Sequence, residues 1–97
     1  MKGRLRKSAR DRACTIRIPG VCNSNPETTV LAHLNGAGMG MKHSDMHGAY
    51  ACSSCHDLVD ARTTTTLYSK DELALMHLEG MVRTQKIMLD EGLILTP

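Results

Sequence analysis

Large aromatic side chains are almost absent from this sequence of 97 residues, which has no Trp, no Phe and only two Tyr. Aromatic residues normally supply much of the buried apolar area, and a chain this short buries only a modest fraction of its surface. The seven Met can fill gaps, but they specify packing poorly. The sequence therefore predicts one small domain whose core needs further support, and its four Cys are the candidates.

Long apolar runs are absent as well. No stretch approaches the roughly 18 apolar residues of a membrane-spanning helix. The N-terminal segment MKGRLRKSARDRACTIR also lacks the apolar run of a signal peptide. We therefore expect a cytoplasmic protein without a membrane partner. In that reducing compartment, four Cys indicate a metal site or catalysis rather than disulfides.

The basic residues are concentrated at the N-terminus. Residues 1–17 contain seven Lys or Arg and one acid, a net charge of +6, whereas the rest of the chain carries −4. We expect a basic arm over residues 1–12, helical or flexible, before a single domain over 13–97. Such an arm suits the phosphate backbone of a nucleic acid, although a disordered solubilising tail has the same composition. The candidate phosphate contacts are Lys2, Arg4, Arg6, Lys7, Arg10 and Arg12.

Turn and strand signals alternate through the first sixty residues. The string CTIRIPGVC, residues 14–22, predicts a tight β-hairpin or a knuckle with a thiol at each end. A strand over 28–34 is expected next, followed by an irregular Gly-rich loop over 35–48. A short strand over 49–52 and the first turns of a helix over 53–62 complete this part of the chain.

Capping signals mark the two main helices. Ser53 or Ser54 can cap the first. The string SKDE, residues 69–72, matches a capping box and predicts a second helix that reaches Gly92 and is weakened or bent at Gly80. Its apolar residues recur at helical spacing, which favours core or dimer contacts. These residues are Leu73, Met76, Met81, Met88 and Leu89.

The four Cys form two pairs, Cys14 with Cys22 and Cys52 with Cys55. Two thiol pairs brought together give the tetrahedral four-sulfur environment that structural zinc prefers. The second pair has the common two-residue spacing, and the first is wider. Because a four-Cys site is closed, its zinc cannot activate water. The sequence therefore predicts a structural zinc, and catalysis must come from other residues.

The string CSSCH, residues 52–56, has two other interpretations. Cys-x-x-Cys-His is the attachment signature of a c-type haem, and Cys-x-x-Cys also occurs in thiol-redox enzymes. Haem attachment requires export, for which the sequence gives no sign, and it leaves Cys14 and Cys22 without a role. The redox interpretation lacks the βαβ pattern that usually surrounds the motif. Zinc is therefore the favoured interpretation.

Four of the five His fall in a 24-residue window that, with the residues just after it, also holds Asp45, Asp57 and Asp60. This composition favours a second metal site with imidazole and oxygen ligands. On a helix, His56 and Asp60 would share one face, although Asp60 could equally be an exposed acid or pair with Arg62. The fifth, His77, is expected to face solvent or to pack in the C-terminal helix.

The order of these parts resembles the HNH endonuclease family, also called His-Me finger or ββα-metal. The resemblance is greatest to small nucleases of lambdoid prophages related to the phage recombination-enhancement nuclease. The matching strings are CTIRIPGVCNSNPETTVLAH, GMGMKHSDMHGAYACSSCHD and LVDAR, which together span roughly residues 13–62. The resemblance implies a small zinc-stapled α+β domain of the ββα-metal type with a long C-terminal helix. It also implies a metal-dependent DNA endonuclease that acts in recombination or DNA processing.

The resemblance assigns roles to individual residues. His33 matches the general base that activates the attacking water. His56 matches a ligand of a divalent ion, magnesium or manganese, that neutralises the scissile phosphate and stabilises the leaving oxygen. At the position where the family usually has Asn, this chain offers Asp45, which would orient His33 or bind the metal.

One position departs from the family pattern. Many relatives carry a metal-binding acid just before the first His, and this chain has Ala32 there. Asp45 and Asp60 are the candidates to replace that acid, and weaker ones are His43 and His47. The alternative function is a non-catalytic, zinc-stabilised adaptor that binds nucleic acid or protein. Under the nuclease interpretation, DNA is the substrate, a recombinase is a candidate partner, and the C-terminal helix is a candidate homodimer contact.

Overall fold

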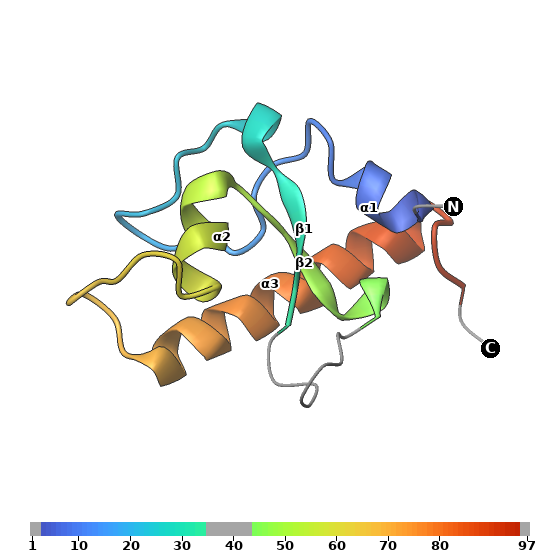
Figure 1. Ribbon diagram of the computed structural model, residues 1–97. Coiled ribbons are helices and arrows are strands. Elements are labelled where there is room, and N and C mark those ends of the chain that lie inside the picture. The colour runs from blue at the N-terminus through green and yellow to red at the C-terminus, as the bar shows by residue number, and fades with distance from the viewer. Residues whose placement is uncertain (1–2, 35–43, 96–97) are drawn as a thin grey trace.

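The computed structural model describes residues 3–34 and 44–95, which form a small α+β domain. A long C-terminal helix, α3, runs across a two-stranded sheet, with α2 near its N-terminal half and α1 near its C-terminal end (Figure 1). This confirms the predicted α+β class and the long helix. The elements are α1 (Arg4–Ser8), the 3-10 turn η1 (Pro26–Thr28), β1 (Val30–His33), the 3-10 turn η2 (Asp45–His47), β2 (Gly48–Ala51), α2 (Ser53–Val59) and α3 (Lys70–Asp90).

The sheet pairs β1 with β2 in antiparallel register, from Val30 opposite Ala51 to His33 opposite Gly48. Every residue of β2 is buried, and α3 packs mainly against this strand. The strand β1 begins later than predicted because Asn25 caps η1 through its side chain and holds residues 26–28 in a 3-10 turn. None of the helices in the described part of the chain has both the length and the apolar character needed to cross a membrane.

The segment over 14–22 is a knuckle, and the hairpin alternative is wrong. Residues 14–22 contain no strand. The backbone N–H groups of Val21 and Cys22 both donate to the carbonyl of Ile18, at 3.0 and 2.9 Å. Arg17 has a φ of 53° and turns its N–H toward Cys14 Sγ, 3.5 Å away. These three N–H groups donate to a turn carbonyl and to a sulfur atom, so none of them is available for pairing between strands.

The basic N-terminal segment packs against the body of the domain. Ala9 is buried in a cluster with Leu31, Tyr50 and Met88. The hydroxyls of Ser8 and Tyr50 lie 2.7 Å apart. At the other end of the chain, Arg4 Nη2 donates to the carbonyl of Leu93 at 3.0 Å, and Arg12 pairs with the Glu91 carboxylate. The boundary between a 1–12 arm and a 13–97 domain stays a prediction, but residues 4–12 are not detached.

The buried face of α3 is largely polar or small, unlike the predicted Met-rich stripe. Of that stripe only Met88 is fully buried. Leu73 and Met76 are partly buried and pack against the core, as predicted, whereas Leu89 is 39% exposed. Thr84 accepts a hydrogen bond from the backbone of Tyr50 at 2.9 Å and lies 2.9 Å from the hydroxyl of Thr15. Small hydrogen-bonded residues let the helix lie close to β2. The buried residues of α3 are His77, Gly80, Thr84 and Met88.

Gly80 marks a close contact, whereas the sequence predicted a weak point. The helix α3 continues through Gly80 without a break. A Cβ at this position would lie 2.9 Å from Ile16 Cγ1 and 3.1 Å from Ile16 Cα. Only glycine therefore lets α3 approach the segment that carries the first Cys pair.

A Gly80→Ala variant is expected to be less stable than the wild type by about 1 kcal/mol. Alanine favours helix by about 1 kcal/mol, but forcing a methyl into a packed contact costs about 1–3 kcal/mol. The free energy of unfolding in urea is the measurement. The matched control is Glu79→Ala, one residue earlier on the exposed face, which should change stability by no more than about 0.5 kcal/mol. A stabilised Gly80→Ala variant would contradict the close contact.

Candidate metal centre and active site

The four cysteines come together in one cluster. Their sulfur atoms all lie within 4.8 Å of one another. The knuckle contributes Cys14 and Cys22, and the junction between β2 and α2 contributes Cys52 and Cys55. Cys22 is partly exposed, and the other three are buried.

The spacing of the sulfurs suits a metal such as zinc. Four sulfurs at about 2.3 Å from a tetrahedral ion are about 3.8 Å apart. Cys22 Sγ and Cys52 Sγ lie 3.8 Å apart. Backbone N–H groups also point at the sulfurs, from Arg17 to Cys14 at 3.5 Å and from Cys55 to Cys52 at 3.4 Å. Such donors stabilise thiolates, which are the form that binds metal.

The protonation of the cluster favours a charged donor set. Hydrogen bonding from the Cys55 thiol lowers the pKa of Cys14 to about 4, with the N–H of Arg17 adding to the effect. The same contact with Cys14 raises the pKa of Cys55, and burial raises that of Cys22. The lowered pKa of Cys14 favours its thiolate form, and binding of a cation by thiol groups releases their protons.

The N-cap of α2 differs from the prediction. Cys52 occupies this position, and its sulfur accepts the N–H of Cys55. Ser53 and Ser54, the predicted caps, instead accept hydrogen bonds from the side chain of Asn23, at 3.0 and 3.3 Å. The Cys-x-x-Cys spacing itself was the signal, because a sulfur three residues before an N–H can cap a helix as a hydroxyl does.

His33 and Asp45 are in direct contact. His33 ends β1 and Asp45 begins η2. The ring Nε2 of His33 lies 2.6 Å from Asp45 Oδ1, and Arg6 Nε donates to the same oxygen at 3.1 Å. The side chains of His33 and Asp45 are 21% and 24% exposed, so the ring is held but reachable. The hydrogen bond from His33, followed by that from Arg6, lowers the pKa of Asp45 below its usual value of 3.8.

This shift predicts a pH-dependent stability. A carboxyl whose pKa is lower in the folded chain stabilises the fold above its unfolded pKa, and this contribution is lost as the pH falls through the folded pKa. An Asp45→Asn variant should therefore be less stable than the wild type by about 1 kcal/mol at about pH 6, and by progressively less below about pH 4. Urea unfolding across this range is the measurement. A constant difference between the two proteins would contradict the prediction.

His56 and Asp60 lie on one side of α2. Asp60 Oδ2 is 3.8 Å from His56 Nε2 and 3.3 Å from Arg62 Nε. The two interpretations of Asp60, neighbour of His56 and partner of Arg62, are therefore both present in the geometry. The helix α2 ends at Val59, earlier than the predicted 53–62, because Ala61 has a φ of 59° that no helix continues. His56 and Asp60 are partly exposed and could bind a divalent cation.

His77 packs beneath the candidate active-site residues and binds the backbone of β1. It is buried, and its Nε2 donates to the carbonyl of Ala32 at 2.8 Å, so the packing alternative is confirmed and the solvent-facing alternative is wrong. Burial is the main cause that lowers its pKa. Among the weaker effects, the charge of Asp60 raises that pKa, whereas those of His56 and His33 lower it. His77 thus lies within electrostatic range of all three and fixes the strand residue just before His33.

Two further supports were not found by sequence reasoning. The first is His77, which lies on the buried face of α3 with Gly80, Thr84 and Met88. The helical spacing of these four residues is the sequence pattern that could have indicated a buried face. Gln85 donates to the carbonyl of Met46 at 2.6 Å, which ties η2 and its Asp45 to α3. No local sequence pattern could predict that contact, because the two residues lie 39 positions apart in the chain.

The basic residues divide by environment. Arg6 reaches Asp45, and Arg4 and Arg12 bind groups near the C-terminal end of the chain. Lys7 and Arg10 are exposed. Lys2 lies outside the described residues, as does His43. His47 is exposed in η2, with its Nδ1 3.4 Å from the hydroxyl of Ser44.

Comparisons with known proteins place the chain in a family. A family model described as "Putative nuclease YbcO" matches residues 3–93. The curated proteins "Putative nuclease YbcO" of Escherichia coli (strain K12) and "Putative nuclease ybcO" of Enterobacteria phage 82 are each 52% identical over 95 residues, covering 93% of this chain and 95% of theirs. The solved "Structure of a putative bacteriophage protein from Escherichia coli str. K-12 substr. MG1655" is 48% identical, with a TM-score of 0.78 over 92% of this chain and 100% of that one. The chain therefore belongs to the family described as "Putative nuclease YbcO".

Proposed function

We propose that this protein is a metal-dependent DNA endonuclease of the HNH type that acts in recombination or processing of prophage DNA. The observation that carries the proposal is the contact between His33 and Asp45, 2.6 Å apart at a partly exposed strand end. The names of the relatives agree with a nuclease, and one of them belongs to a phage.

In the proposed mechanism His33 is the general base. With its Nε2–H donating to Asp45, the ring presents Nδ1 as the free lone pair, and Nδ1 takes the proton of the attacking water. Asp45 fixes this tautomer and stabilises the imidazolium that forms, while Arg6 keeps Asp45 ionised. The carbonyl of Ala32, held by His77, keeps the end of β1 in place. Asp45 is thereby a positioning residue rather than a metal ligand.

A divalent ion, magnesium or manganese, would supply charge neutralisation at the scissile phosphate. His56 and Asp60 are the residues proposed to hold it, because a partly exposed imidazole and carboxylate lie 3.8 Å apart on α2. The zinc proposed for the four-Cys centre is structural, since four thiolates leave no open position for water. The two metals would therefore have separate roles.

The basic N-terminal segment is proposed to contact the DNA backbone. Lys7 and Arg10 are exposed and follow Arg6, which reaches the His33 and Asp45 pair. Phosphate contacts of this kind give affinity without sequence preference. Lys2, Arg4, Arg6 and Arg12, which the sequence also suggested as phosphate contacts, are proposed to have the same role.

The test is nicking of supercoiled plasmid with added magnesium or manganese, by the wild type and by His33→Ala. The alternative, a zinc-stabilised adaptor, predicts DNA or protein binding with no cleavage by either protein. A recombinase partner stays a prediction, as does the homodimer through α3. For the homodimer, the exposed apolar side chains of that helix are the candidate contacts, namely Leu75, Leu78, Val82 and Leu89.

A further inference from the structure

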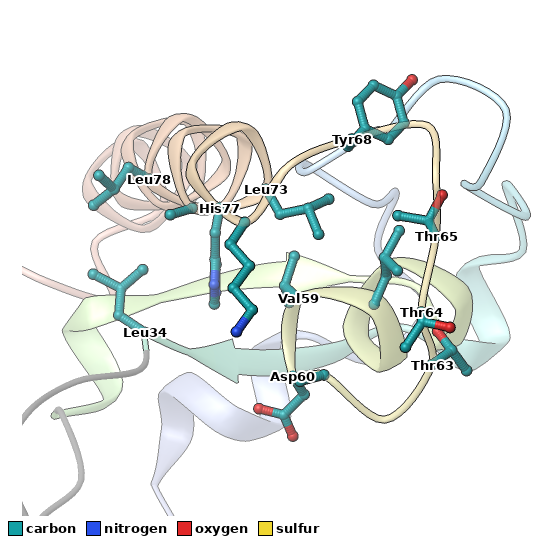
Figure 2. A pocket seen from close by; sticks show the side chains of 14 residues that line it. Leu34, Val59, Asp60, Thr63, Thr64, Thr65, Tyr68, Leu73, His77 and Leu78 are labelled. Atoms are coloured by element: carbon teal, nitrogen blue, oxygen red, sulfur yellow. The ribbon is translucent and has the colours of Figure 1, made fainter.

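A pocket lies beside the candidate active site. It has a volume of about 640 Å³ and is bounded by the end of α2, the segment that follows it, and the first half of α3. In Figure 2, Val59 and Leu73 meet near its centre, while Leu34 and His77 close one side and Thr63 and Thr64 stand on the other. Pockets of about 300–1,000 Å³ commonly hold small ligands, so this one has room for a nucleobase with its sugar.

The lining combines apolar walls with a few polar groups. Leu34, Leu58, Val59, Leu73 and Leu78 supply the walls. Tyr68 is half-buried and its hydroxyl donates to the carbonyl of Pro19 at 2.7 Å, so its ring is held in place before any ligand binds. Such walls suit the flat face of a base, and the threonine hydroxyls can donate to or accept from any base edge.

The charge and the position of the pocket both favour nucleic acid. Lys70 lines it, and within residues 3–34 and 44–95 no carboxylate pairs with this amine. Asp60 lines the pocket too, but its carboxylate points away from the cavity (Figure 2), and its Oδ2 lies 3.8 Å from His56. Leu34 directly follows His33. The pocket and the proposed metal site are therefore adjacent, because Asp60 belongs to both.

We propose that this pocket receives an unpaired nucleobase of the strand that is cut, so that the protein prefers DNA with unpaired nucleotides over continuous duplex. This inference rests on the proposed endonuclease function. A base within a duplex is stacked and paired and cannot enter a side pocket, whereas an unpaired base can enter without the cost of unpairing. With the base in the pocket, we expect its phosphate to lie near Asp60 and His56, where the divalent ion is proposed to bind. Lys70 could then contact a neighbouring phosphate.

The test uses oligonucleotides with 2-aminopurine either unpaired or within continuous duplex, without added magnesium or manganese so that no strand is cut. The wild type should bind the unpaired probe about tenfold more tightly than the duplex, with a change in fluorescence, because stacking on apolar and aromatic side chains has this magnitude. Ala74→Trp fills the pocket and should remove the preference. Glu79→Trp, at an exposed position of the same helix and outside the lining, should keep it.

A second variant guards against misfolding. Leu78 is 44% exposed, so Leu78→Asp should fold normally, and its carboxylate in the wall should also abolish the preference. Equal affinity of the wild type for both probes, or an unchanged preference in Ala74→Trp and Leu78→Asp, would overturn the pocket proposal. Nicking without any preference would leave the endonuclease function standing and reject the pocket. A preference without nicking would support the pocket and reject the endonuclease.

Discussion

His33→Ala should lose plasmid nicking by a factor of at least about 100 while keeping its fold. General-base catalysis contributes about 10²–10⁴ to the rate, and removing the imidazole removes this contribution. The fold should survive because the His33 side chain is partly exposed, and Asp45 keeps its hydrogen bond from Arg6 when His33 is gone. The measurements are the nicking rate with magnesium or manganese and the midpoint of thermal unfolding.

The control for this experiment is Glu79→Ala, an exposed change on α3 that should nick at the wild-type rate. Nicking by His33→Ala at that same rate would show that His33 is not the base. Absence of nicking in all three proteins, together with retained DNA binding, would establish the adaptor alternative.

Cys55→Ser should lose bound zinc and fail to fold stably. Binding of a structural zinc is worth about 10–16 kcal/mol in small domains, which matches or exceeds the about 5–15 kcal/mol that stabilises a typical fold. Cys55 is fully buried and contacts both Cys14 and Cys52 in a chain with few aromatic residues. Metal content by mass spectrometry and the unfolding midpoint are the measurements, and one zinc per wild-type chain is expected.

A comparison with Cys55→Ala separates a metal site from ordinary packing. If Cys55 were only a buried apolar residue, alanine would be tolerated better than serine, and a chelator would leave the wild type unchanged. A zinc ligand requires both substitutions to be equally damaging and the chelator to unfold the wild type. Ser53→Ala, at an exposed position beside the cluster, should retain the metal and serves as the matched control.

Features written in short stretches of sequence could be predicted. The capping box at Ser69 and Glu72 is present as expected, because both of its hydrogen bonds form within one turn of helix. The pairing of Cys14 and Cys22 with Cys52 and Cys55 followed from the shared chemistry of thiols rather than from geometry. The contact between His33 and Asp45 was foreseen as one of two roles for Asp45, and it came from a family resemblance.

Features that depend on distant residues could not be predicted. Gly80 has the composition of a weak helical position, and only the approach of Ile16 turns it into a packing requirement. His77 gave no sign that it would bind the carbonyl of Ala32, 45 residues away. The charge count of the N-terminal segment was correct, but a count cannot say that Arg6 turns toward Asp45 whereas Lys7 is exposed.

The contacts between the two ends of the chain limit how DNA binding can be studied. In Figure 1 α1 and the segment that follows α3 lie on the same side of the molecule, and here Arg4 contacts Leu93 and Arg12 contacts Glu91. Deleting the first twelve residues would remove these contacts and uncover the ring of Tyr50, so a truncated protein would lose stability along with its charges. Replacing the exposed Lys7 and Arg10 with neutral residues leaves the Arg4–Leu93 and Arg12–Glu91 contacts intact. Such variants therefore isolate the electrostatic contribution of these residues to DNA binding.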